Sequence, residues 1–345
     1  MPQDKKLTEK RLSALWDDKN VPTLETKNKK YVLLSDVHLG DKGKADDFRH
    51  NQPTLERALD YYNQHRFTLM LLGDIEELWQ FDLSKIRDKY NTSIYKKMRS
   101  FPDGRFYRIW GNHDSEWGVP NDPARDNQGV SNVAEEAIKL KDQYGLARIM
   151  LVHGNQGSVE SDKSSWASRF FVRLYKYVEP VIKVDPHTSA TKSQIPDNYE
   201  KTLYEWAKKT KTILICGHSH RAIFASRSYW DKLDKNIRKL QKEVQDNRKN
   251  KKIFDFKMKE LEKLINDKIE EEVKKRKVTS LEKKGKPLPC YFNTGCALFT
   301  DGVTTIEIEN DEIRLVKWHR KVRNGTQFTV FDKGVLSDFV KKTVG

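Results

Sequence analysis

The chain has 345 residues, 37% of them hydrophobic, and a formal net charge of +15 at pH 7. This length can bury one large core or two modest ones, and the absence of any run of about 18 apolar residues excludes a membrane-spanning helix. The excess of basic residues favours polyanionic partners such as nucleic acid or an anionic membrane surface.

The cysteines and the first residues bear on the compartment. Cys216, Cys290 and Cys296 are odd in number, and no two of them are closely spaced. This pattern predicts a reducing compartment and no disulfide framework. The N-terminal residues lack an apolar core of signal-peptide length. We therefore expect a soluble, cytoplasmic protein that could also lie on a membrane surface as a peripheral protein.

Residues 1–29 are rich in charged side chains, and we interpret them as a solvated N-terminal extension in which Thr8 to Asp18 could form one amphipathic helix. The next stretch, KYVLLSDVHLG, predicts an apolar strand that ends in a turn. Side chains at positions i and i+2 of an extended segment point the same way. We therefore expect Asp36 and His38 to face one site together.

The plan of an apolar strand followed by polar side chains recurs further along the chain. Pro53 to Gln64 has helical periodicity, and FTLMLLGDIEELW then predicts a strand that ends at Asp74. Tyr90 to Met98 predicts another helix. The strand of RFYRIWGNHD delivers Asn112 to Asp114 at its end, and Asn112 offers a neutral amide oxygen that can ligate a metal.

Three later stretches extend this alternation. NVAEEAIKL predicts a helix, and ARIMLVHG predicts a strand that ends at His153. Strands that alternate with helices indicate a buried sheet with helices on both faces. Residues 155–211 are aromatic and basic without a clear pattern, and they form either a cap folded over the site or peripheral packing. TILICGHSHRAIFAS then predicts strand, turn and strand, with His218 and His220 on one face.

Residues 229–286 are of a different character. Apolar residues with helical spacing occur before and after the polar break QDNRKNKK, in the sets Leu233, Ile237, Leu240, Val244 and Phe254, Met258, Leu261, Ile265, Ile269. This pattern predicts two helices in an antiparallel hairpin, inserted between two strands of the main domain. Residues 231–286 contain 20 Lys and Arg against 12 Asp and Glu, so they contribute +8 of the net charge.

Three interpretations of this arm remain open. Its Lys and Glu side chains could simply pair along solvated helices. It could instead bind nucleic acid or an anionic membrane surface, or it could mediate self-association.

After the arm, CYFNTGCALF and TTIEIENDEIRLVKWHR predict paired strands that complete the sheet. We interpret residues 30–320 as the main domain and residues 321–345 as a C-terminal tail.

Seven side chains of metal-ligand type stand at the ends of predicted strands: Asp36, His38, Asp74, Asn112, His153, His218 and His220. Mixed imidazole and carboxylate ligation suits manganese, iron, zinc or nickel and disfavours calcium and magnesium. Seven ligands exceed what one ion needs, but they suit two ions that share a carboxylate. Because two divalent ions outweigh two ligand carboxylates in charge, we expect a phosphate-containing substrate.

The blocks D-x-H, GD, GNHD, HG and GHSH follow one another in this order, and the pattern resembles that of the calcineurin-like metallophosphoesterases from Tyr31 to about His319, apart from the arm. The resemblance implies an α/β fold, strictly α+β with four layers, in which a β-sandwich is flanked by helices. It implies a dinuclear centre at the carboxyl ends of the strands, with manganese as the expected metal and iron, zinc or nickel as alternatives.

The same resemblance assigns roles by motif. Asp36, His38 and His220 would hold the first ion, Asp74 would bridge the two ions, and the second ion would be held by Asn112, His153 and His218. Asp74 and His113 would be the catalytic residues, with His113 protonating the leaving oxygen or steadying the phosphoryl group. Glu77 and Asp114 would lie just behind the ligands.

Glu77 and Trp79 within GDIEELW, together with the aromatic segment between HG and GHSH, resemble the branch that contains the UDP-2,3-diacylglucosamine pyrophosphatases. On this resemblance the candidate substrate-binding residues are Trp79, Trp166, Phe170 and Phe171. That branch typically has Arg at the position of His113 and Asp at the position of Asn155.

The predicted function is a dinuclear metal-dependent hydrolase of phosphodiesters or phosphomonoesters, in which a bridging hydroxide attacks phosphorus in line. One alternative is a pyrophosphatase of the UDP-diacylglucosamine type at the membrane surface. A second is a metal-dependent nuclease, and a third is a non-catalytic interaction module on the same fold.

Overall fold

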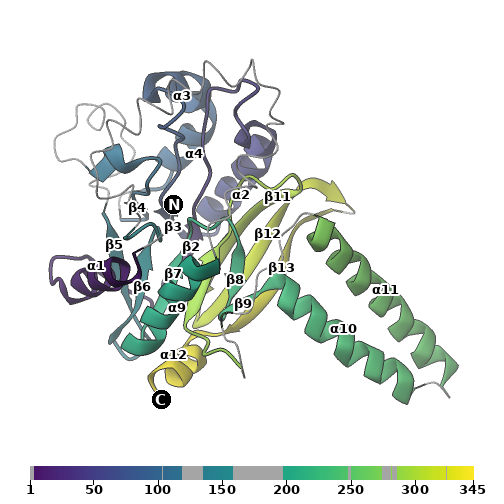
Figure 1. Cartoon of the computed structure of the whole chain (residues 1–345). Helices are drawn as coiled ribbons and strands as arrows, with labels where there is room; N and C mark the ends of the chain where they lie inside the picture. The colour runs from purple at the N-terminus through teal and green to yellow at the C-terminus, as the bar shows by residue number, and fades with distance from the viewer. Residues whose placement is uncertain are drawn as a thin grey trace.

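Two β-sheets lie face to face at the centre of the fold, and helices cover the outer face of each sheet (Figure 1). The structure is a computed structural model, and it describes residues 4–102, 104–118, 135–157, 197–247, 250–273, 281, 286–323 and 325–345. The order of layers is helix, sheet, sheet, helix. This arrangement confirms the predicted four-layer α/β fold built on a β-sandwich.

One sheet has six strands in the order β13-β12-β11-β2-β3-β4. Its strands are β2 (Lys30–Leu34), β3 (Thr68–Leu72), β4 (Phe106–Ile109), β11 (Gly302–Glu309), β12 (Glu312–Arg323) and β13 (Thr326–Val335). β2, β3 and β4 are parallel, whereas β11, β12 and β13 are antiparallel to their neighbours. The carboxyl ends of β2, β3 and β4 therefore meet at one edge of this sheet.

The other sheet has seven strands in the order β1-β5-β6-β7-β10-β8-β9. Its strands are β1 (Thr23–Glu25), β5 (Ala137–Lys141), β6 (Ala147–Val152), β7 (Ile213–Cys216), β8 (Ala222–Phe224), β9 (Arg227–Ser228) and β10 (Tyr291–Thr294). β6, β7 and β10 are parallel to one another. The ends of β6 and β7 therefore also open at one edge.

The strands are apolar on both faces because each face meets a different core. In β3, Leu69 and Leu71 face the helices, whereas Met70 and Leu72 face the opposite sheet. β6 and β7 show the same alternation between the inner core and the core beneath the helices of the other side. This two-residue period explains why each strand is a continuous apolar run in the sequence.

Helices cover both outer faces. The six-stranded sheet is covered by α2 (Gln52–Gln64), α3 (Leu83–Tyr90), a π-helical turn (Asn91–Tyr95) and α4 (Lys96–Arg99). The seven-stranded sheet is covered by α1 (Lys5–Asp17) and α9 (Asp197–Thr210). Two short 3-10 turns lie at Phe48–Asn51 and Ser115–Gly118. The helices expected near residues 53–64 and 90–98 are present, but the second begins as a π-helical turn and not as a regular α-helix.

The predicted helix in NVAEEAIKL is wrong. From Ala137 this stretch is strand β5, which pairs antiparallel with β6. Ile138 and Leu140 face the inner core, and Ala137 faces the outer one. Tertiary pairing with β6 and β1 overrides the helix propensity of Ala, Glu and Lys in this segment.

The N-terminal residues are not a solvated extension. Thr8 and Leu12 of α1 are fully buried against the seven-stranded sheet and α9. β1 then pairs in parallel with β5 at the edge of the same sheet. The interpretation of residues 1–29 as a separate charged extension is therefore corrected, because one apolar face of α1 is covered.

The C-terminal residues are also part of the fold. Residues 326–335 form β13, and α12 (Leu336–Val344) places Leu336 and Val340 in the core between the sheets. The interpretation of residues 321–345 as a tail is corrected in the same way. Within the segment interpreted as a cap, residues 197–210 form α9, whose buried Leu203 and Trp206 pack on the sheet.

The inserted arm consists of α10 (Tyr229–Asp246) and α11 (Lys251–Val273), which pack on each other and project away from the sheets (Figure 1). Its small core contains Ile237, Leu240, Val244 and Leu261. The strands on either side of the arm belong to one sheet, because β8 pairs with both β9 and β10. No helix in the described part of the chain is long and apolar enough to cross a membrane.

Candidate metal centre

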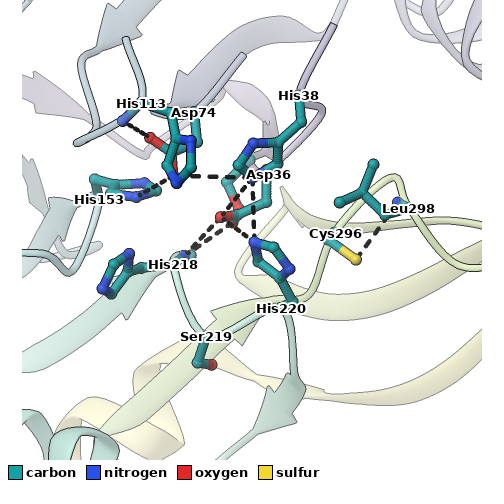
Figure 2. A network of polar contacts seen from close by, with 12 residues as sticks. Asp36, His38, Asp74, His113, His153, His218, Ser219, His220, Cys296 and Leu298 are labelled. Atoms are coloured by element: carbon teal, nitrogen blue, oxygen red, sulfur yellow. Dashed lines mark hydrogen bonds and ion pairs between the residues drawn. The ribbon is translucent and has the colours of Figure 1, made fainter. Parts of the chain in front are cut away.

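The seven predicted ligand residues all follow strands whose ends meet at one edge of the sandwich. The six-stranded sheet contributes four of them and the seven-stranded sheet three: Asp36 and His38 after β2, Asp74 after β3, Asn112 after β4, His153 after β6, and His218 and His220 after β7. Figure 2 shows that the side chains of His38, Asp74, His153 and His220 converge on one small region. The structure thus brings together residues that lie up to 184 positions apart in the sequence.

Five of these residues have a left-handed backbone, namely Asp36, His38, Asp74, His218 and His220, with φ between 51° and 67°. This conformation costs a residue other than glycine on the order of 1–3 kcal/mol, so it persists only where the surroundings enforce it. Strain of this kind clusters at sites that bind ligands or catalyse reactions. Its presence at five of seven ligand-type positions supports a functional site.

Backbone hydrogen bonds between the loops hold these conformations in place. The amides of Asp36 and His38 donate to the carbonyls of Gly73 and Asp74, at 3.1 and 3.0 Å. Gly73 itself has φ +88°, and a Cβ atom there would lie 2.6 Å from Nδ1 of His153. Glycine is therefore needed at this position both for its backbone angle and for the close approach of the histidine ring.

The first group of side chains consists of Asp36, His38 and His220. Nε2 of His220 lies 3.2 Å from Nε2 of His38 and 3.2 Å from Oδ1 of Asp36. His38 Nε2 and Asp36 Oδ1 are 3.9 Å apart. Atoms that bind one ion at about 2.0–2.1 Å lie roughly 3 to 3.5 Å from one another. Both distances from His220 fall in this range, and the distance between His38 and Asp36 is longer.

The second group gathers around His153. Its Nε2 lies 3.1 Å from Oδ2 of Asp74 and 3.2 Å from Oδ1 of Asn112. The ligand atoms of Asp74, His153 and His218 all lie within 4.8 Å of one another. Oδ2 of Asp74 is also 3.9 Å from Nε2 of His38, so one carboxylate faces both groups.

Hydrogen bonds at Nδ1 orient two of the imidazoles. His153 Nδ1 lies 2.7 Å from the carbonyl oxygen of Leu72, and His38 Nδ1 lies 2.8 Å from Oε2 of Glu77. Both partners accept protons, so Nδ1 is the donor and Nε2 of the neutral ring presents its lone pair to the site. Lone pairs of nitrogen and oxygen then converge, which is an arrangement that a cation stabilises.

The charges of the site favour a proton on His153, a side chain that could bind a metal ion. Burial opposes ionisation of Asp74, but His153 and His113 hold the pKa of its carboxyl well below the usual range. Burial lowers the pKa of His153, yet the Asp74 carboxylate raises it to about 9 overall. Burial and the nearby His153 lower the pKa of His218 to about 3. Metal binding must therefore release a proton from His153, which couples affinity to pH.

His113 lies beside the two groups, where Glu77 and Trp79 contact its ring. Its Nδ1 is 2.8 Å from Oε1 of Glu77, whose other oxygen binds His38. The indole of Trp79 stacks on the His113 ring at 3.9 Å and donates from Nε1 to the carbonyl of Asn112 at 2.9 Å. Burial lowers the pKa of His113, but Glu77 and Asp74 raise it to about 9 overall.

A buried ion-pair network lies behind Asp74, and of its three members the sequence had pointed only to Asp114. Arg108 on β4 binds Asp114 at 2.8 Å and also binds Glu76, and all three residues are almost fully buried. Asp114 also accepts the amides of Gly111 at 2.6 Å and Asp74 at 3.1 Å. The network therefore fixes the loop after β4 to the loop after β3. A charged residue inside the otherwise apolar run FYRIW was the available signal.

Polar residues of β10 and β2 support the other side of the site in a similar way. The amide of fully buried Asn293 donates to the carbonyl of Gly217 at 2.5 Å and to Oγ of Ser219 at 3.0 Å. Ser35 binds both the Asp36 carboxylate and Oγ1 of Thr294. These contacts hold the GHSH loop and Asp36, and nothing in the spacing of the motifs pointed to them.

The remaining predicted site residues divide into two sets. Glu77, Asp114 and Trp79 lie directly behind or beside the seven ligand-type residues. Trp166, Phe170 and Phe171 lie outside the described residues. The three cysteines are buried, and none is joined in a disulfide.

A family model described as calcineurin-like phosphoesterase matches residues 29–222, which is more than half of the chain. The matched range includes six strands of the sandwich core and all seven ligand-type residues. A search of curated proteins finds no match.

Proposed function

Since the chain belongs to the calcineurin-like phosphoesterase family and is a metal-dependent hydrolase of phosphoester bonds, we propose that it uses two divalent metal ions, held by the seven side chains of the candidate centre. The position of Asp74 carries this proposal. Its Oδ2 lies 3.1 Å from Nε2 of His153 and 3.9 Å from Nε2 of His38, so it can serve both groups of ligands.

We assign the first ion to Asp36, His38 and His220, and the second to Asn112, His153 and His218, with Asp74 between them. The mixture of imidazole, carboxylate and amide donors suits manganese, with iron, zinc or nickel as alternatives. When bound, the ions would supply positive charge to phosphoryl oxygens and lower the pKa of a water molecule.

The chain's own contribution to proton transfer is His113. Its Nδ1 is held by Glu77, so Nε2 is the atom that can deliver a proton to the leaving oxygen. Glu77 keeps the ring charged, because its own pKa is held at about 2 by His113 and His38 despite burial. Stacking on Trp79 restricts rotation of the ring, which keeps the proton aimed at one place.

Metal analysis of two variants tests the assignment of the ligands. Asp74→Ala should lose both ions and activity together, since it removes the atom that both groups share. Asn112→Ala should mainly weaken the second ion and retain the first. Two ions still bound in Asp74→Ala would overturn the shared-carboxylate arrangement.

A comparison of leaving groups tests His113. His113→Ala should keep both ions and lose roughly 10²- to 10⁴-fold in turnover on substrates with poor leaving groups. The loss should shrink on an activated aryl phosphate, whose oxygen leaves without a proton. An equal loss on both substrates would show that His113 acts in another way, for example by steadying the phosphoryl group.

The class of phosphoester is open to a direct screen. We propose a phosphodiesterase or phosphomonoesterase over a UDP-diacylglucosamine-type pyrophosphatase, since His113 stands where that branch has Arg. A metal-supplemented panel of phosphomonoesters, phosphodiesters, nucleotide-linked pyrophosphates and single-stranded nucleic acid separates these activities from a nuclease. A non-catalytic module is disfavoured, because such a module would be expected to lack some ligands and all seven are present.

A further inference from the structure

The ion-pair network behind Asp74 continues outward to two aromatic side chains. The Glu76 carboxylate accepts hydrogen bonds from Oη of Tyr95 at 2.8 Å and from Nε1 of Trp117 at 3.1 Å. Tyr95 ends the π-helical turn between α3 and α4, and Trp117 lies in a 3-10 turn after β4. Their side chains are buried, at 1% and 5% exposure. π-helical turns are rare and occur frequently at functional sites.

The charges of the network explain why it needs these two neutral donors. Glu76, Arg108 and Asp114 are buried and carry two formal negative charges against one positive charge. One guanidinium therefore serves two carboxylates, and its Nη2 atom contacts both of them. Buried charged groups are stable only where pairing and hydrogen bonds satisfy them. Tyr95 and Trp117 supply donors to Glu76, whereas backbone amides supply them to Asp114.

The amides that bind Asp114 belong to the loops that carry candidate ligands. Its two oxygens accept the amides of Asp74 at 3.1 Å, Ile75 at 2.8 Å and Gly111 at 2.6 Å. The carbonyl of Asp74 in turn accepts the amide of His38 at 3.0 Å. A shift of the Asp114 carboxylate would therefore move the backbone that carries Asp74 and, through it, that of His38.

We propose that Tyr95 and Trp117 are positioning residues that set the place of Asp74. When either donor is lost, Glu76 has one hydrogen bond fewer and attracts the guanidinium of Arg108 more strongly. The guanidinium then moves away from the other carboxylate, and the amides that this carboxylate holds are less restrained. The inference rests on the proposed role of Asp74 as the shared ligand, and its consequence is weaker metal binding.

A second network in the same molecule provides a matched control. Tyr62 on α2 donates to Oε1 of Glu307 at 2.7 Å, and Arg314 binds the other oxygen of Glu307 at 2.7 Å. Trp318 donates from Nε1 to Oη of Tyr62 at 2.8 Å. Tyr62 and Tyr95 are each 1% exposed. Within the described residues, the side chains of Tyr62 and Glu307 form no hydrogen bond to a loop that carries a candidate ligand. The two networks thus match in residue types and differ in what they adjoin.

Tyr95→Phe and Tyr62→Phe test the proposal, since each removes one hydroxyl and keeps the ring. In metal-free protein, hydrogen exchange in peptides that cover residues 73–78 and 109–114 should accelerate for Tyr95→Phe and stay unchanged for Tyr62→Phe. Calorimetric titration with manganese should show roughly tenfold weaker binding for Tyr95→Phe, as expected for a residue that supports a ligand from behind. Tyr62→Phe should keep the affinity of the unaltered protein. Urea denaturation should show a lower midpoint for both variants.

Trp117→Phe and Trp318→Phe repeat the comparison on the other pair of donors, with the same expected pattern. If Tyr95→Phe lowers the urea midpoint but leaves hydrogen exchange and manganese affinity unchanged, the network is structural only and the proposal is wrong. Equal weakening of manganese binding in Tyr62→Phe would overturn it as well. The exchange measurement needs no metal. A protein that binds no manganese would therefore contradict the proposed function, and the exchange result would still decide whether Tyr95 positions the loops.

Discussion

The N-terminal helix and the inserted hairpin are alike in sequence and opposite in structure. Both are highly charged segments with apolar residues at helical spacing. Leu12 of α1 is completely buried. The four residues that form the core of the hairpin are its most buried side chains, and each of them remains 6–7% exposed. The difference lies in what faces each helix: α1 faces a sheet and a second helix, and α10 and α11 mostly face each other.

The contacts of α1 also reach the candidate metal centre. Thr8 packs so closely on Gly157 that a Cβ atom there would meet the backbone of Thr8 at 2.6 Å. Gly157 lies four residues after His153 in the chain. Trp206 of α9 donates from Nε1 to Oγ of Ser13 at 3.0 Å, and Tyr199 of α9 packs against the His218 ring. α1 therefore supports both elements behind the second group of ligands, while the hairpin touches neither group in the described part of the chain.

Removal of α1 should have the largest effect. Deleting residues 1–17 exposes the apolar surface of α9 and of the sheet beneath Leu12, so we expect a loss of about 4 kcal/mol or more in the free energy of unfolding. Urea denaturation followed by tryptophan fluorescence measures the loss. If the truncated protein unfolds at the same urea concentration as the full chain, α1 is no more integral to the fold than the hairpin.

Shortening one buried side chain in α1 and one in the hairpin compares the two regions directly. Leu12→Ala should lower the free energy of unfolding by about 3 kcal/mol, as expected for a fully buried leucine. Leu261→Ala in the hairpin should leave that global transition in place and weaken only α10 and α11. Amide hydrogen exchange distinguishes the two results, because the loss of protection in Leu261→Ala should be confined to the arm.

The hydrogen bond between α1 and α9 should contribute less to the free energy of unfolding than the burial of Leu12 does. Ser13→Ala and Trp206→Phe should each lower the free energy of unfolding, the first by about 1 kcal/mol for the lost bond. Trp206→Phe should cost more, since it also reduces buried area. In a double-mutant cycle the two losses should not add, because each variant removes the same bond. Full additivity would show that the bond contributes nothing.

Deletion of the hairpin should have the smallest effect. Replacing Leu233 to Gly285 with a short Gly/Ser linker should leave a folded, metal-binding enzyme with unchanged activity on a small aryl phosphate. The replacement is sterically simple, because β8 pairs with both neighbouring strands and keeps the ends of the arm close together. Loss of folding in this variant would show that the arm packs on the catalytic core as α1 does.

Sequence patterns anticipated most of the core and the arrangement of the candidate site. Runs such as YVLL and LMLL are apolar at every position, which two-sided burial explains, and the residues after them lie at strand ends where such sites form. The five motif blocks were informative because each placed its side chains at the end of a parallel strand.

The patterns failed where distant residues decide the outcome. Ala137 to Lys141 have helical propensity, but β6 and β1 on either side make them a strand. Arg108 is buried among apolar residues only because Glu76 and Asp114 neutralise it, and neither pairing is visible in local spacing. α1 was judged by its own charge, whereas its burial depends on Gly157 and Trp206, which are far away in the chain.

The pairing of β2 with β11 has a consequence for the order of events during synthesis. β2 is complete at Leu34, yet one of its two neighbours is formed by residues 306–309. Asp36 and His38 therefore leave the ribosome long before the sheet that contains β2 can close. Contacts of such wide sequence separation form slowly. Metal loading is thus expected to follow completion of the chain, after its last strands have docked.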